Sequence, residues 1–149
     1  MSAYEILKAY DQTLMHIEDI LQTSKGTNNI QLENLCRFLF GIRFLGVFSA
    51  NEFPKRIKNN QCFIINNKPN NSKTGGEHWI AAYKYKNKIY MYDTFDRKIK
   101  DLSKYFKNKN IVNANSDRQQ SYYEYNCGER CVTWLILFDK YKTKIINVI

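Results

Sequence analysis

The chain has 149 residues, of which 44% are hydrophobic and 15% aromatic, enough apolar material for the core of one domain. No apolar stretch approaches the roughly 20 residues of a membrane-spanning helix, and the first residues lack the basic-then-apolar pattern of a signal peptide. We therefore expect one intracellular domain over residues 1–149, with no membrane contact.

The net charge of +9 comes mostly from lysine, which is dense between residues 98 and 109 and again between 140 and 144. Two explanations stay open. An AT-rich genome favours Lys, Asn, Ile and Tyr codons, and the chain is rich in all four. Alternatively, the lysines form a nucleic-acid-binding surface. We prefer the first explanation, because no known nucleic-acid-binding motif accompanies the charge.

The first third of the chain predicts two amphipathic helices followed by an irregular segment over residues 41–54. We place an N-terminal helical region at residues 1–26, the core at 30–140 and a tail that frays at 141–149. In the first helix, over residues 4–21, the expected buried side chains are Leu7, Tyr10, Leu14, Ile17 and Leu21. In the second helix, over residues 31–40, they are Leu32, Leu35, Cys36, Leu39 and Phe40.

The rest of the chain predicts strands and then a late helix. Residues 62–65 form a short apolar strand, and residues 78–85 and 88–93 form a hairpin in which Ile89 and Met91 share a face. A short helix near residues 101–106 and a strand at 111–114 follow. The last helix begins at Cys127. This order predicts an α+β fold, with a mixed sheet packed against helices, rather than a wound parallel sheet.

Cys127 lies where the polar segment ends and the last helix begins. Free backbone N–H groups and the helix dipole at such a position stabilise a thiolate, and Gly128 leaves room for a substrate backbone. An ordinary buried cysteine is the alternative, and it fits Cys36, Cys62 and Cys131 well. We expect all four as reduced thiols without a metal, because no CxxC pair is present.

A nucleophilic cysteine needs a general base, and His78 is the candidate. The other histidine, His16, falls inside the first predicted helix. A structural histidine is the alternative interpretation. Trp79 beside it forms either an apolar wall of a substrate channel or part of the core.

The base in turn needs an orienting acid, and the oxyanion needs a donor. Asp93, at the end of the second hairpin strand, is the candidate acid, with Asp96 as its rival. Gln120, seven residues before Cys127, is the candidate oxyanion donor, although the neighbouring Gln119 weakens that assignment.

These motifs together resemble a known family. The segments GGEHW (75–79), YMYDTF (90–95) and NCG (126–128), with Gln120 between the last two, occur in the order found in the adenain-like maturation proteases of adenoviruses, polintons and virophages. LGVFSANEFP (45–54) and FIINN (63–67) are also similar to that family. The resemblance covers about residues 31–138.

The resemblance implies the α+β cysteine protease fold that is shared with SUMO-deconjugating proteases. His78 would be the base, Asp93 its acid partner, Gln120 the oxyanion donor and Cys127 the nucleophile, with Trp79 and Gly128 contacting substrate. The implied activity is cleavage of viral capsid or core precursors at Gly-containing sites during maturation, by a monomer in the virion or in the viral factory of the host cell, without metal or organic cofactor.

Two departures from the family limit this expectation. Asp96 replaces a glycine that usually follows the acid-bearing turn. No cysteine lies between Asp93 and Cys127, so a disulfide-linked activating peptide is not expected, whereas activation by DNA stays open. The alternatives are a deconjugase of ubiquitin-like modifiers and a non-enzymatic, nucleic-acid-binding virion protein.

Overall fold

The computed structural model describes residues 1–21, 28–52, 54–66, 79–93, 110–114 and 126–149. Within these ranges lie three α-helices, α1 (Ala3–Leu21), α2 (Asn29–Phe40) and α3 (Cys127–Tyr141). Five strands form one sheet: β1 (Phe44–Phe48), β2 (Cys62–Asn66), β3 (Trp79–Tyr85), β4 (Lys88–Tyr92) and β5 (Ile111–Asn113). The expected α+β class is confirmed.

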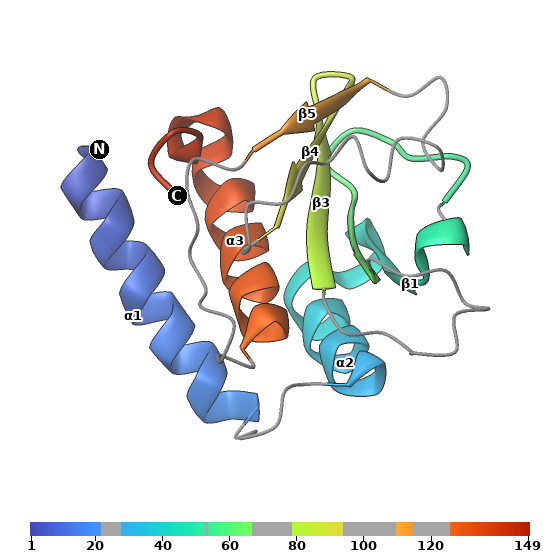
Figure 1. The fold of residues 1–149 in the computed structure, drawn as a ribbon, viewed down its shortest axis with the longest axis horizontal. Coiled ribbons are helices and arrows are strands. Elements are labelled where there is room, and N and C mark those ends of the chain that lie inside the picture. The colour runs from blue at the N-terminus through green and yellow to red at the C-terminus, as the bar shows by residue number, and fades with distance from the viewer. Residues whose placement is uncertain (22–27, 53, 67–78, 94–109, 115–125) are drawn as a thin grey trace.

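The sheet is mixed, with the strands in the order β1-β2-β3-β4-β5. The central strands β2, β3 and β4 are antiparallel, whereas β1 runs parallel to β2 and β5 runs parallel to β4. α3 packs on one face of the sheet, and α1 packs against α3 on the side away from the sheet (Figure 1). α3 is therefore the central helix, and most of its side chains are buried.

An aromatic stack joins α3 to the sheet. The Trp134 ring lies 5.5 Å from that of Tyr92 and 4.8 Å from that of Phe138, and the Phe138 ring lies 4.9 Å from that of Tyr83. Large aromatic rings dominate the stability that a core gains from burial. Each stacked pair adds about 0.5–1.5 kcal/mol beyond the burial of its surface. The opposite face of the sheet carries a second cluster that contains Ile89 and Met91, as predicted.

The hairpin between β3 and β4 follows the sequence closely. Lys86 and Asn87 have φ values of 48° and 65°, the left-handed conformation that a two-residue primed turn requires. The capping box of Asn28 and Gln31 starts α2 at Asn29, two residues before the predicted start. The strand at 111–114 and the helix starting at Cys127 are also present.

Three expectations about burial and structure are wrong. Ile6 rather than Leu7 is buried on α1, because the buried face starts with the i, i+4 pair Ile6 and Tyr10. Leu39 of α2 is 38% exposed, because the buried stripe of α2 is narrower than its apolar pattern. Residues 41–54 are not wholly irregular, since they contain β1. Gly46, with a φ of 141°, and a register shift between Phe44 and Val47 interrupt the alternation that marks a strand.

The C-terminal tail does not fray. After α3, a 3₁₀ turn (Lys142–Ile145) returns the chain to the core, where Ile145 and Ile149 are 0% and 1% exposed. The predicted helix near 101–106 lies outside the described residues.

Candidate active site

Cys127 is the first residue of α3 and is 9% exposed. The preceding residue, Asn126, makes no side-chain cap on the helix; its Oδ1 instead accepts a hydrogen bond from Arg130 Nε at 3.0 Å. The backbone N–H groups of Cys127 and Gly128, at the start of the helix, lower the pKa of the Cys127 thiol. The predicted position of the cysteine, at a helix N-terminus with N–H groups around it, is confirmed.

The thiol of Cys127 does not gain the low pKa that this position suggested. Burial raises its pKa, the backbone N–H of Trp79 lowers it, and the nearby Glu129 carboxylate raises it again. Burial exceeds the effect of the N–H donors contributed by the described residues. The structure therefore favours a protonated thiol that needs a base, rather than a thiolate stabilised by the helix alone.

Trp79 connects the cysteine to the sheet. It is the first residue of β3, and its backbone N–H donates to the sulfur of Cys127. The first residues of β3 and α3 therefore meet, toward the same end of the molecule (Figure 1). His78 is joined to Trp79 by one peptide bond, but it lies outside the described residues. Gln120 and the two rival candidates, Asp96 and Gln119, also lie outside the described residues.

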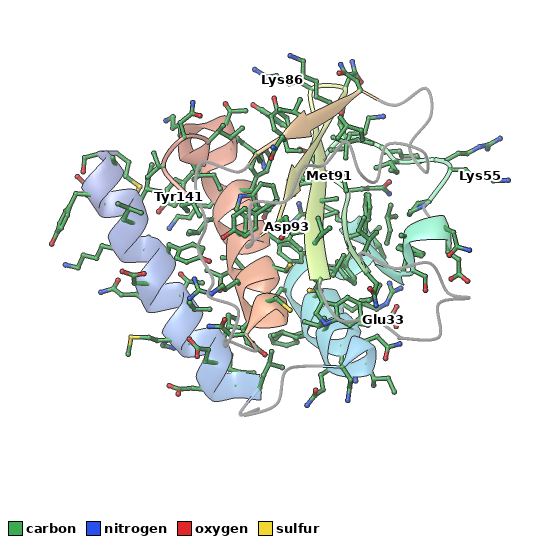
Figure 2. All side chains as sticks on the ribbon, in the orientation of Figure 1. Glu33, Lys55, Lys86, Met91, Asp93 and Tyr141 are labelled. Atoms are coloured by element: carbon green, nitrogen blue, oxygen red, sulfur yellow. The ribbon has the colours of Figure 1, made fainter. Side chains whose placement is uncertain are left out.

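Asp93 follows β4 directly and is 1% exposed (Figure 2). Tyr92, the residue before it, pairs with Ala81 of β3. The Asp93 carboxylate contributes to the raised pKa of Cys131 on α3. Cys131 lies one helical turn after Cys127. The structure thus brings the predicted acid to the part of α3 that carries the predicted nucleophile.

Glu129 is a second buried carboxylate at this site, and it was not among the predicted site residues. It is 2% exposed in the first turn of α3, and its charge raises the pKa of Cys127. Carboxylates are almost never so buried unless they have partners. The only signal in the sequence was the charged pair Glu129-Arg130 between two cysteines, directly before the apolar run of α3. Arg130 itself donates to the Tyr10 hydroxyl at 3.3 Å and so joins α3 to α1.

The other three cysteines are free and fully buried in the core. Burial raises the pKa of Cys62 to about 12 and raises that of Cys36 further. Such thiols are unreactive, which fits the structural role expected for them. Among the described residues, no three His, Cys, Asp or Glu side chains gather in a way that would hold a metal ion.

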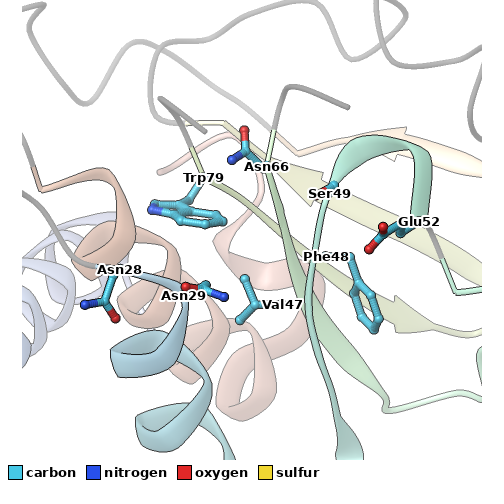
Figure 3. A pocket seen from close by; sticks show the side chains of 8 residues that line it. All are labelled: Asn28, Asn29, Val47, Phe48, Ser49, Glu52, Asn66 and Trp79. Carbon is cyan, nitrogen blue, oxygen red and sulfur yellow. The ribbon is translucent and has the colours of Figure 1, made fainter. Parts of the chain in front are cut away.

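A groove of about 510 Å³ adjoins Trp79, whose backbone contacts Cys127. Trp79 lines it together with residues from the end of β1, the end of β2 and the start of α2 (Figure 3). The Trp79 side chain also packs against the main core, as the alternative interpretation of this residue expected. Gly128, which follows Cys127 in α3, is also buried. The arrangement offers a buried thiol, N–H donors, a buried acid and an adjoining groove.

No model of a known protein family matches this chain, and no curated protein shows detectable similarity to its sequence. Among the described residues, no helix combines the length and apolar character needed to cross a membrane.

Proposed function

We propose that this chain is a cysteine endopeptidase that uses Cys127 as nucleophile. The observation that carries the proposal is the meeting of α3 and β3: the Cys127 sulfur, at the N-terminus of α3, accepts the backbone N–H of Trp79. In the sequence, Trp79 directly follows His78, one of only two histidines. The buried Asp93 lies near the same helix and would orient the base.

The proposed reaction has two steps. His78 takes the proton of the Cys127 thiol, and the sulfur attacks the peptide carbonyl to form a tetrahedral intermediate. Backbone N–H groups at the start of α3, together with the Gln120 amide, stabilise the oxyanion. His78 then gives its proton to the leaving amine. In the second step, water hydrolyses the thioester, releasing the acid and restoring the thiol.

The raised pKa of Cys127 supports a role for a base in this mechanism. A thiol that stays protonated near neutral pH is a poor nucleophile until a neighbouring group removes its proton. The carboxylate of Asp93 would stabilise the imidazolium that forms at His78.

We propose the maturation of virus particles as the biological setting, with capsid or core precursors cut at Gly-containing sites. This part of the proposal, with its adenain-like fold and its location in the virion or viral factory, depends on the resemblance of the motifs. The net charge of +9 supports DNA as an activator, because a basic surface would hold the enzyme on the viral genome.

Proteolysis of a Gly-biased peptide library tests the proposal. Wild type and Cys127→Ala are compared by mass spectrometry, with and without DNA. We expect wild type alone to cleave, and DNA to increase the rate at low salt. Equal cleavage by Cys127→Ala, or no cleavage by wild type in any condition, would contradict the assignment.

A further inference from the structure

The groove that Trp79 lines has a composition that differs from the rest of this basic chain. Five of its eight described lining residues are polar, Glu52 is the only charged one, and no cation is among them. The whole chain, in contrast, has 23 Lys and Arg against 14 Asp and Glu. The polar residues are Asn28, Asn29, Ser49, Glu52 and Asn66.

A single residue, Trp79, connects the groove to the candidate nucleophile Cys127. The backbone of Trp79 donates to the Cys127 sulfur, and the Trp79 side chain lines the groove. Asn66 pairs with Trp79 in the sheet register and also lines the groove. A peptide whose carbonyl reaches Cys127 therefore has a neighbouring side chain close to this opening.

Trp79 and Glu52 lie at opposite ends of the lining (Figure 3). Figure 3 shows the Trp79 indole near Val47 and Asn29 at one end, and the Glu52 carboxylate beyond β1 at the other. The volume of about 510 Å³ leaves room for a long side chain to extend between them. Glu52 is exposed, so it lies at the rim rather than in a closed cavity.

A long cationic side chain matches this order of surfaces. The methylene stem of lysine or arginine packs on apolar and aromatic walls while the charged head reaches a carboxylate, and a cation near an indole gains further attraction. An acidic side chain would meet Glu52 with like charge. An aliphatic side chain would gain no attraction from the Glu52 carboxylate.

We propose that this groove is a specificity subsite that accepts a lysine or arginine side chain close to the scissile bond. The inference rests on the proposed protease function, since it uses the connection of the groove to Cys127 through Trp79. It adds a feature of the substrate, namely a basic residue flanking the Gly-containing cleavage site.

The first experiment measures binding independently of turnover. Fluorescent Gly-containing peptides, with one position at a time changed to Lys, Leu or Glu, are titrated against Cys127→Ala by anisotropy at about 150 mM salt, where long-range attraction is screened. The protein's net positive charge would by itself favour the Glu peptides. We expect one Lys position to bind most tightly, and the further change Glu52→Gln to weaken that binding by about three- to tenfold.

A matched control is Glu18→Gln, which removes an exposed carboxylate on α1 away from the groove. It should leave the preference for Lys unchanged. Tighter binding of Leu or Glu peptides at every position, or a Lys preference that survives Glu52→Gln, would overturn the subsite.

Cleavage by wild type separates this inference from the proposed function. If wild type cuts the same Lys peptides faster than the Leu peptides, and Glu52→Gln loses that difference while still cutting the Leu peptides normally, both proposals hold. If Lys peptides bind with the expected dependence on Glu52 but nothing is cut, the subsite stands and the protease assignment fails. If wild type cleaves the peptides without any preference for Lys, the protease assignment stands and the subsite fails.

Discussion

At the scale of single residues, the state of Cys127 reflects a competition between burial and backbone donors. The helix N-terminus supplies N–H groups to the sulfur, but burial and the Glu129 carboxylate raise the pKa of the thiol. A helix terminus lowers a thiol pKa most effectively when the sulfur stays partly hydrated. Here the cysteine is 9% exposed, so the chemistry depends on its neighbours.

Glu129 provides the first prediction at this scale. Glu129→Gln removes a negative charge near Cys127 while keeping nearly the same shape, so the pKa of Cys127 should fall. The rate of alkylation by iodoacetamide, followed against pH, should reach its half-maximal value at a lower pH than in wild type. Glu18→Gln serves as the control, and a shift to higher pH in Glu129→Gln would contradict the placement of its carboxylate.

At the scale of elements, a polar network joins four parts of the chain at the sheet. The Asp139 carboxylate of α3 accepts hydrogen bonds from Arg43 at 2.6 and 3.2 Å and from the Tyr83 hydroxyl at 2.7 Å. Lys142 donates to the same hydroxyl at 3.0 Å. These contacts join the turn after α2, strand β3, helix α3 and the turn after α3. The hydrogen bonds from Arg43 and Tyr83 hold the pKa of Asp139 below its usual value despite burial.

The second prediction concerns this network. Asp139→Ala leaves Arg43 and Tyr83 without their shared acceptor, and we expect the free energy of unfolding to fall by about 1–2 kcal/mol in urea denaturation. Glu33→Ala is the matched control, because Glu33 and Arg37 form an exposed pair at 3.0 Å that contributes less than about 0.5 kcal/mol. Equal effects of the two substitutions would contradict the importance of the network.

The third prediction tests the glycine within β1. Gly46 has a φ of 141°, and an added Cβ would lie 3.1 Å from the ring of Phe48. Gly46→Ala should therefore cost about 1–3 kcal/mol of stability, measured by thermal and urea unfolding. Lys88→Ala, at the exposed start of β4, should cost little. A stable Gly46→Ala protein would mean that β1 adopts another backbone path.

The sequence predicted correctly those helices and strands whose positions depend on neighbouring residues in the chain. The Lys86-Asn87 turn defines the hairpin, and the apolar run after Cys127 defines α3, and both are present. β1 was missed because Gly46 and its register shift break the alternation, and its pairing with β2 is a tertiary contact. The buried tail was missed for a similar reason, since the core that receives Ile149 is formed by distant parts of the chain.

The candidate site shows the same division. The position of Cys127 at a helix start followed from the sequence, because it depends on a local change from polar to apolar residues. The direction of its pKa shift and the burial of Glu129 did not, because they depend on how tightly α3 packs against β3 and α1.

At the scale of the whole molecule, the buried thiols make stability depend on alkaline pH. Cys62 has its pKa raised to about 12, whereas an unfolded chain has thiols that ionise near pH 8.5–9. Folding therefore retains protons that the unfolded chain loses, and stability must fall as pH rises above the unfolded pKa.

The fourth prediction is that the protein loses stability at alkaline pH. Under reducing conditions, the free energy of unfolding should decrease between pH 8 and 9.5, approaching about 1.4 kcal/mol per pH unit for each fully buried thiol. Cys62→Ala should be less stable at pH 7 but should show a shallower decline with pH. A free energy that stays constant or rises over this range would contradict the burial of these cysteines.

The most direct test of the central claim is to trap the nucleophile. Wild type, His78→Ala and Asp93→Asn are treated at neutral pH with a Gly-containing peptide that carries an electrophilic vinyl sulfone, and the modified residue is located by mass spectrometry. We predict labelling of Cys127 alone in wild type, much slower labelling in both variants, and no labelling of the buried Cys36, Cys62 or Cys131. Labelling that is equally fast in His78→Ala, or that spreads over several cysteines, would contradict the proposed catalytic thiol and its base.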